Sequence, residues 1–328
     1  MTRSTLDRRT FLRAATLAPF ATTWPAFGQA AWPSRAIRII VPFVPGAFTD
    51  VSARLVAQEL SEQLGQPVVV ENRGGAGGTI GTWEVVRAPA DGYTLLLTDT
   101  SLAIAPGLYP KLNYDVIRDL VQISRIAECP SILVVRPGLG PKTVAELVEY
   151  AKKNPGKLTF GSGGPGSSAH LAMELFLEVA GIKALHVPFR GVAQSITETV
   201  AGHIDMSIAS IAAALGQVKG GTLIGLAVSG EKRSVLLPDV PTFIEAGYPR
   251  YDMTYWWGIA APARTSAELV ARLNREIVRA CGQERLKHAF VQQAALAVSS
   301  TPEEMTAQLK KEVALWRGII AEAKVTIE

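Results

Sequence analysis

Short apolar runs alternate with amphipathic stretches along most of the chain. The run at residues 36–43 is rich in isoleucine and valine, and apolar positions at helical spacing follow from Val51 to Leu64. Asp50 directly precedes that helix and is predicted to cap its N-terminus. The other runs predict strands at residues 67–70, 93–98, 157–161, 184–188, 204–208 and 223–228.

Helical patterns fill the spaces between these runs, for example at residues 168–180 and 192–201. Helix starts are marked by a threonine with a glutamate three residues later, and we expect a capping box at the first of them. These pairs are Thr143 with Glu146, Thr265 with Glu268, and Thr301 with Glu304. Strands that alternate with helices of this length predict an α/β fold with parallel sheets and βαβ crossovers.

Two strand-like runs, 131–136 and 257–261, lie where the chain would pass between two lobes. With these crossings, lobe one comprises residues 31–131 and 254–328, and lobe two comprises residues 132–253. A chain that leaves a lobe and returns makes a two-stranded hinge. Because open parallel sheets bind ligands at the carboxyl ends of their strands, we expect the lobes to share one cleft.

The first 30 residues have the features of a signal peptide. Arg8 and Arg9 stand in the motif D-R-R-T-F-L-R, an apolar run follows at 14–27, and small residues end it at 28–30. We expect residues 1–30 to be a twin-arginine signal, with an ordinary secretory signal as the alternative. The run is too short to span a bilayer.

Removal of a signal peptide would change the net charge of the chain. Of the 33 basic and 29 acidic residues, four arginines and one aspartate lie in the first 30, which leaves 29 and 28 in the mature chain. A net charge of +1 gives no basic field for nucleic acid, so we expect no nucleic-acid partner. No later stretch is long and apolar enough to predict a membrane span.

Reactive side chains do not form a known catalytic or metal-binding pattern. Cys129 and Cys281 match no zinc or redox spacing; a disulfide and two separate buried thiols both remain open. The four histidines show no metal spacing, and we expect no cofactor and no metal. An exported hydrolase using Ser162 or Ser168 lacks a base at a recognisable position, so we expect no enzyme.

Two loops between a strand and a helix are candidate anion sites. Residues 44–50 and residues 161–170 are rich in small side chains, and the second loop adds hydroxyl groups. Such loops present backbone N–H groups at a helix N-terminus, where the helix dipole favours an anion. Each is also compatible with a simple tight turn.

Longer motifs carry a family resemblance. They are W-P-S-R-A-I-R-I-I-V-P-F at 32–43, Q-P-V-V-V-E-N-R-G-G-A-G-G at 66–78, D-G-Y-T-L-L-L at 91–97, H-L-A-M-E-L-F at 170–176, H-V-P-F-R-G at 186–191 and L-P-D-V-P-T at 237–242. In order and spacing the chain resembles the Bug-type receptors of tripartite tricarboxylate transporters. The resemblance implies a periplasmic binding protein of the Venus-flytrap type, type II-like, with two α/β lobes and two crossing strands.

The resemblance also implies a function. Such receptors bind small carboxylates through backbone amides, hydroxyls and water, and act in the periplasm with membrane transporter subunits or a sensor. We expect a monomer. The predicted ligand-binding residues are Gly46, Ala47, Phe48, Thr49, Thr98, Thr100, Ser162, Ser167, Ser168, Ala169, His170, Arg190 and Asp205.

Several of these roles have alternatives. Ser168 is also expected to cap its helix, and Asp205 either faces the cleft or binds local backbone. The first loop departs from the family pattern P-G-G-G-T-D, since Ala47 and Phe48 replace two glycines. Phe48 would stack on an aromatic acid, narrow the pocket or point outward. Trp256 and the following Trp257 would stack a ring or pack in the hinge.

Overall fold

The computed structural model describes residues 32–327. The predicted signal peptide at residues 1–30 lies outside the described residues. Every described helix and strand lies within the unit that begins at Arg35.

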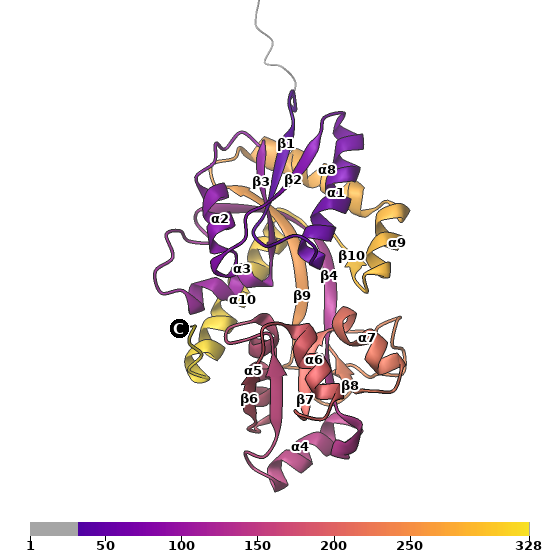
Figure 1. Cartoon of the computed structure of the whole chain (residues 1–328). Helices are drawn as coiled ribbons and strands as arrows, with labels where there is room; N and C mark the ends of the chain where they lie inside the picture. The colour runs from indigo at the N-terminus through magenta and orange to yellow at the C-terminus, as the bar shows by residue number, and fades with distance from the viewer. Residues whose placement is uncertain (1–31, 328) are drawn as a thin grey trace, which may run out of the picture. The chain divides into compact units, whose positions relative to one another are not determined.

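Within residues 32–327, ten strands form one connected sheet in the order β2-β1-β3-β9-β4-β7-β5-β6, with β8 and β10 also paired to β4 (Figure 1). The long strand β4 (Leu120–Val135) belongs to both halves of this sheet. It pairs with β9 (Thr254–Pro262) as far as Pro130, and with β7 (Met206–Ser210) from Ser131 onward. We use lobe one for the half around β1, and lobe two for the half around β7.

Lobe one combines four further strands with helices on its faces. Its strands besides β9 are β1 (Ile37–Val41), β2 (Val68–Asn72), β3 (Thr94–Asp99) and β10 (Leu296–Ala297). Its helices are α1 (Phe48–Leu64), η1 (Ala76–Gly78), α2 (Thr79–Val86), α3 (Thr100–Leu108), α8 (Ala267–Cys281), α9 (Glu284–Gln292) and α10 (Pro302–Glu322). Helix α10 packs on α3 and also contacts lobe two at α5.

Lobe two is the smaller half. Its strands besides β7 are β5 (Thr159–Ser162), β6 (Leu185–Pro188) and β8 (Ile224–Val228). Its helices are η2 (Pro137–Leu139), α4 (Val144–Lys153), α5 (Ser168–Ala180), α6 (Val192–Val200) and α7 (Ile211–Lys219).

Strand direction follows the path of the chain. The outer strands are parallel, β1 with β2 and β3, and β5 with β6 and β7, as the βαβ rhythm predicts. The strands β4 and β9 are antiparallel, because one leaves lobe one and the other returns to it. The predicted run 131–136 corresponds to the last part of β4, which begins at Leu120 and ends at Val135.

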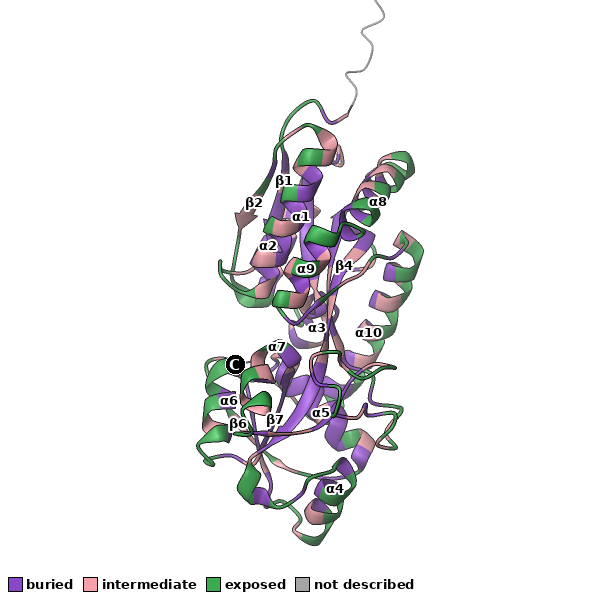
Figure 2. Cartoon of the chain, turned by 90° about the vertical axis from the view of Figure 1, so that its right-hand side faces the viewer, coloured by how far each residue is buried: buried purple, intermediate pink, exposed green. Residues whose placement is uncertain are grey.

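The core lies where helices cover both faces of the parallel strands. Ile39, Ile40, Leu95 and Leu96 on β1 and β3 are fully buried. Figure 2 shows most of the central strands buried and the outer sides of the helices exposed, whereas the outer strand β2 is mostly of intermediate exposure. Continuous apolar runs such as 36–43 are thereby explained, because a strand covered on both faces needs apolar side chains in both directions.

The predicted helix starts are partly corrected. Helix α1 begins at Phe48 with Ala47 at the N-cap, so Asp50 lies inside the first turn and is not the cap. Its carboxylate instead accepts from the Gly46 amide at 3.2 Å and from Asn72 Nδ2 at 2.9 Å. These contacts tie the first turn of α1 to the loop before it and to β2.

Only one of the three predicted capping pairs forms a capping box in the structure. Thr301 and Glu304 form a complete capping box at α10. Thr143 caps α4, but the Glu146 carboxylate accepts from the Lys142 amide, so no reciprocal box forms there. At α8 the cap is Ser266, one residue later than predicted.

Candidate functional site

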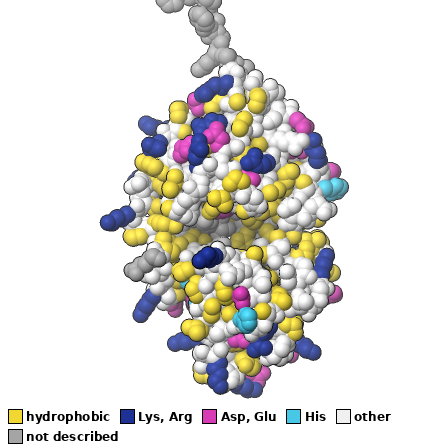
Figure 3. Space-filling model, in the orientation of Figure 1, with side chains coloured by type: hydrophobic (Ala, Val, Ile, Leu, Met, Phe, Trp, Pro, Cys, Tyr) yellow, Lys and Arg dark blue, Asp and Glu magenta, His cyan; other side chains and the backbone are white. Residues whose placement is uncertain are grey.

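A cavity of ≈ 540 Å³ lies between the two lobes, at the carboxyl ends of β3, β5 and β7. In Figure 3 hydrophobic side chains gather across the middle of the molecule's face, with charged side chains mostly above and below them. Polar lining residues from lobe one include Thr49, Asp99, Thr100 and Ser101, and those from lobe two include Ser167, Ser168 and Ser210. The expected cleft at the strand ends is therefore present.

Among the described residues, four helices have their N-cap residue on the wall of this cavity. The N-caps are Ala47 of α1, Asp99 of α3, Ser167 of α5 and Ser210 of α7, and all four residues line the cavity. Ala47 and Ser210 make no side-chain capping bond, so the first-turn amides of α1 and α7 have no protein side chain as acceptor. Uncapped helix N-termini are donors for an anion.

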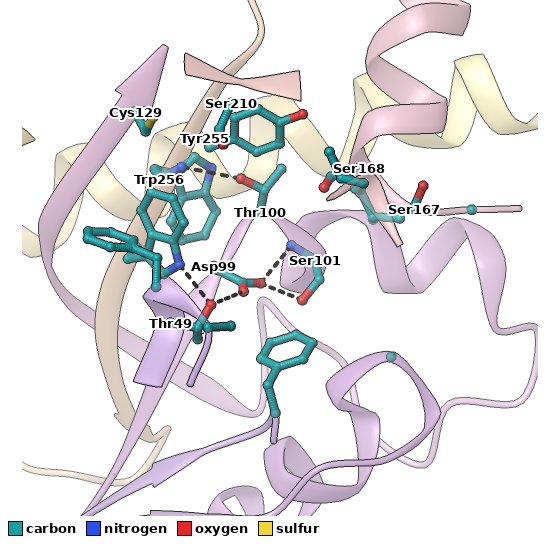
Figure 4. Close-up of a pocket in the computed structure, with 18 of the residues that line it drawn as sticks. Thr49, Asp99, Thr100, Ser101, Cys129, Ser167, Ser168, Ser210, Tyr255 and Trp256 are labelled. Atoms are coloured by element: carbon teal, nitrogen blue, oxygen red, sulfur yellow. Dashed lines mark hydrogen bonds between the residues drawn. The ribbon is translucent and has the colours of Figure 1, made fainter. Parts of the chain in front are cut away.

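Asp99 organises the lobe-one wall, as Figure 4 shows. Its Oδ1 accepts from the Ser101 amide at 2.9 Å and from the Ser101 hydroxyl. Its Oδ2 accepts from Thr49 Oγ1 at 3.3 Å, and Thr49 Oγ1 in turn accepts from Trp257 Nε1 at 3.0 Å. A chain of donors therefore runs from the indole through the hydroxyl to the carboxylate.

The electrostatics of the cavity are unusual for an anion site. Within the described part of the chain, no Lys, Arg or His lines it. Burial raises the pKa of the Asp99 carboxyl, and the hydrogen bonds from Ser101 and Thr49 partly oppose this rise. An anionic ligand would therefore be held by dipoles and hydroxyls rather than by an ion pair.

Aromatic rings form much of the remaining lobe-one surface. Phe48 meets Trp257 edge to face with ring centroids 4.4 Å apart, and it contacts Phe290 at 5.6 Å. Trp256 is 2 % exposed and its Nε1 donates to the Glu312 carboxylate at 2.8 Å, which fixes the hinge strand to α10. Phe48 and both tryptophans line the cavity, so Phe48 does not point outward.

The tyrosine on the hinge strand β9 links the lobes. Burial raises the pKa of Tyr255, and a hydrogen bond with Ser168 opposes part of that rise. This contact joins the returning strand to the N-terminus of α5. Ser167, not Ser168, caps α5, because its Oγ accepts from the His170 amide at 3.3 Å.

Six predicted residues meet at the cavity wall: Ala47, Phe48, Thr49, Thr100, Ser167 and Ser168. Others support the lobe-two loop from behind. The Ser162 hydroxyl lies 2.6 Å from His186 Nε2, and His170 Nδ1 accepts from the Gly166 amide at 3.1 Å. The two imidazole rings stack at 3.8 Å, while Ala169 is buried in the same turn.

Four further predicted residues lie away from the cavity wall and from this support. Asp205 lies at the start of β7, at the opposite edge from Ser210, where it pairs with Arg136 at 2.9 Å and accepts from the Thr159 amide and hydroxyl at 3.0 Å. Its contacts fit the local structural alternative. The other three are Gly46, whose amide donates to Asp50, the exposed Arg190, and Thr98, which is 2 % exposed.

Comparison with known proteins identifies the family. The model of the tripartite tricarboxylate transporter family receptor, TctC, matches residues 52–325. The chain belongs to this family. It is therefore a solute-binding receptor and not an enzyme.

Individual relatives span nearly all of the receptor. Protein BugT of Bordetella pertussis is 38% identical over 293 residues, covering 89% of this chain and 90% of the relative. The structure of R. palustris Rpa4515 with adipate has a TM-score of 0.76 and 32% identity, covering 90% of this chain and 99% of the other. MatC from Rhodopseudomonas palustris with bound malate has a TM-score of 0.73 and 29% identity, covering 88% and 99%.

Both cysteines are free and buried, so no disulfide joins them, as in the second of the two interpretations left open above. Between residues 32 and 327, no cluster of three or more metal-ligating side chains occurs. No helix in that range has the length and apolar character needed to cross a membrane.

Sequence reasoning missed Asp99, Ser101 and Ser210 at the receptor's cavity. A signal was available, because all three lie within three residues after the end of a predicted apolar strand, the region that faces a ligand in open α/β sheets. The candidate loops were selected by their glycine content, and this criterion could not find D-T-S at 99–101, which contains no glycine.

Proposed function

We propose that this receptor captures a small carboxylate outside the cytoplasmic membrane and delivers it to the membrane subunits of a tripartite tricarboxylate transporter. The observation that carries the proposal is the meeting of four helix N-termini from both lobes at one cavity that, in the described residues, has no basic side chain. Adipate and malate in two similar solved structures are ligands of the proposed class.

The proposed binding residues are the six predicted ones on the cavity wall together with Ser210. The first-turn amides of α1 and α7 have no capping side chain, and they would donate to the carboxylate. We further propose that the receptor acts as a monomer whose lobes are residues 31–131 with 254–328 and residues 132–253. The change of partners in β4 between Pro130 and Ser131 supports this boundary.

Thermal unfolding in the presence of organic acids tests the function. A true ligand at a hundredfold excess over its Kd should stabilise the receptor by about 2.7 kcal/mol, because only the folded chain binds it. Adipate and malate should be included, with adipamide as the uncharged control. If no mono- or dicarboxylic acid raises the Tm, a carboxylate receptor is excluded.

We also propose export through the twin-arginine route, supported by Arg8 and Arg9 in the motif D-R-R-T-F-L-R. Arg8→Lys combined with Arg9→Lys should leave the precursor in the cytoplasm, as measured by cell fractionation. Arg3→Lys, outside the motif, is the matched control and should be exported normally. Normal export of the double variant would leave only the ordinary secretory signal.

A further inference from the structure

The four helix N-termini at the cavity are not chemically equivalent. Ala47 and Ser210 give α1 and α7 no capping side chain, and Ser167 caps α5 with a neutral hydroxyl. Helix α3 alone among them is capped by a carboxylate, that of Asp99. The ends of α5 and α7 attract an anion, and Asp50 in the first turn of α1 is paired with Arg54 at 2.9 Å. The end of α3 has the carboxylate of Asp99 beside it, for which the described residues provide no ion pair.

Within the described residues, the hydrogen bonds of the Asp99 carboxylate all come from donors, the amide and hydroxyl of Ser101 and the hydroxyl of Thr49. Ser101 occupies two acceptor sites of Oδ1, and Thr49 occupies one site of Oδ2. A carboxylate has about four acceptor sites, so one site on Oδ2 remains. The residue lies on the cavity wall with intermediate exposure, so a ligand can reach it.

No cation balances this carboxylate from the cavity side, since the lining residues in the described range include no Lys, Arg or His. Burial raises the pKa of Asp99, whereas the hydrogen bonds that Ser101 and Thr49 donate to the carboxylate lower it and favour the charged form. A group brought next to Oδ2 is favoured when it donates a hydrogen bond, and is disfavoured when it carries a second negative charge.

We propose that the ligand is a carboxylate that also carries an N–H or O–H donor, in chemical class an amino acid or a hydroxy acid. Its donor would meet Asp99 Oδ2, and its carboxylate would face the N-termini of α5 and α7 across the cavity. This inference rests on the proposed function and narrows it. A plain dicarboxylate would place its second charge against Asp99.

Matched ligand sets test the inference on the purified receptor by titration calorimetry. The aliphatic set is hexanoate, adipate, 6-hydroxyhexanoate and 6-aminohexanoate. The aromatic set is benzoate, terephthalate, 4-hydroxybenzoate and 4-(aminomethyl)benzoate. Within each set only the distal group changes. In the set that fits the cavity, a donor-bearing acid should bind about tenfold more tightly than the parent acid, the effect of one hydrogen bond to a charged group, and the dicarboxylate should bind most weakly.

Asp99→Asn removes the charge and keeps a side chain that caps a helix well, so the fold of α3 is preserved. This variant should lose the about tenfold preference for the donor-bearing acid, and its affinity for the dicarboxylate should rise. Asp115→Asn is the matched control, because Asp115 also accepts from backbone amides, those of Ile117 and Arg118, but is exposed and outside the cavity lining. It should leave the ranking unchanged.

The outcomes separate this inference from the proposed function. Tightest binding of the dicarboxylate by the wild type, or an unchanged ranking in Asp99→Asn, would overturn the inference while the receptor remained a carboxylate binder. Absence of binding by every acid in both sets would overturn both. A preference for the ammonium over the hydroxyl group supports an amino acid, and the reverse preference supports a hydroxy acid.

Discussion

The two walls of the cavity use the same backbone device with different side chains. In lobe one, the strands lead into Ala47-Phe48-Thr49 and Asp99-Thr100-Ser101, beside the rings of Trp256 and Trp257. In lobe two, they lead into Gly166-Ser167-Ser168 and Ser210-Ile211-Ala212, where hydroxyls and small side chains dominate.

This difference divides recognition into two parts. Backbone amides and hydroxyls at a helix N-terminus hold any carboxylate, because they read only its charge and two oxygens. Large rings and the acid on the cavity wall respond to the rest of the ligand, through its shape, its stacking and its hydrogen-bond donors. We therefore infer that lobe two supplies general affinity and lobe one supplies ligand identity.

The largest expected effect lies at the edge of lobe two away from the cavity. Asp205→Ala removes an ion pair with Arg136 and two hydrogen bonds from Thr159, all at side chains that are mostly buried. The free energy of unfolding should fall by about 2 to 3 kcal/mol, measured by urea denaturation. Ligand affinity measured on the folded protein should not change. A loss of affinity with intact stability would place Asp205 in the binding site.

Phe48→Gly tests the lobe-one wall. If the ring stacks on the ligand, affinity for an aromatic acid should fall by about 1 to 2 kcal/mol, while affinity for a small aliphatic acid stays or rises. Phe48→Leu keeps apolar bulk without the ring and serves as the matched variant. Calorimetry that shows equal affinities for both acids in all three proteins would remove Phe48 from the site.

Ser167→Ala tests the lobe-two wall and should act equally on every carboxylate. One lost hydrogen bond weakens binding by about 1 kcal/mol, and the lost cap of α5 lowers stability by about 0.5 to 2 kcal/mol. Ser168→Ala is the paired control, since Ser168 is not the cap. Calorimetry and thermal unfolding of both variants separate the two effects. A change that depends on the ligand body would contradict the proposed division between lobes.

The smallest expected effect is the pH response of the support behind the lobe-two loop. Burial, with the charge of His170, lowers the pKa of His186 to about 4, below the ordinary value of 6.5. The folded state therefore favours the neutral ring, and this contribution to stability is complete above pH 6.5 and is lost as pH falls from 6.5 toward 4. As pH falls from 6.5 toward 4, the Tm of His186→Gln should decrease less than the Tm of the wild type. The exposed His203 provides the control, His203→Gln, which should follow wild type.

Local sequence determined the helices and strands and several residues of the candidate site. The apolar run at 36–43 requires a strand covered on both faces, and Thr301 with Glu304 starts α10, because both signals act within a few residues. The glycine-rich stretch at 161–170 likewise predicted a loop at a helix N-terminus, and α5 begins within it at Ser168. Predicted helix starts differed from the observed ones by one to three residues where several side chains compete for the same first turn, as at Asp50 and Thr265.

Tertiary structure alone decided which of these ends share a cavity. Asp99 lies opposite Trp257 because β3 and β9 pair in that register, and Thr49 reaches both although it is 208 positions from Trp257 in the sequence. Asp205 and Ser210 illustrate the same point. They lie at opposite ends of the short strand β7, and only Ser210 lies at the end that faces the cavity. Strand order and register depend on packing summed over the whole sheet. A local pattern of residues therefore predicts a donor or an acid but not the side chains that it will face.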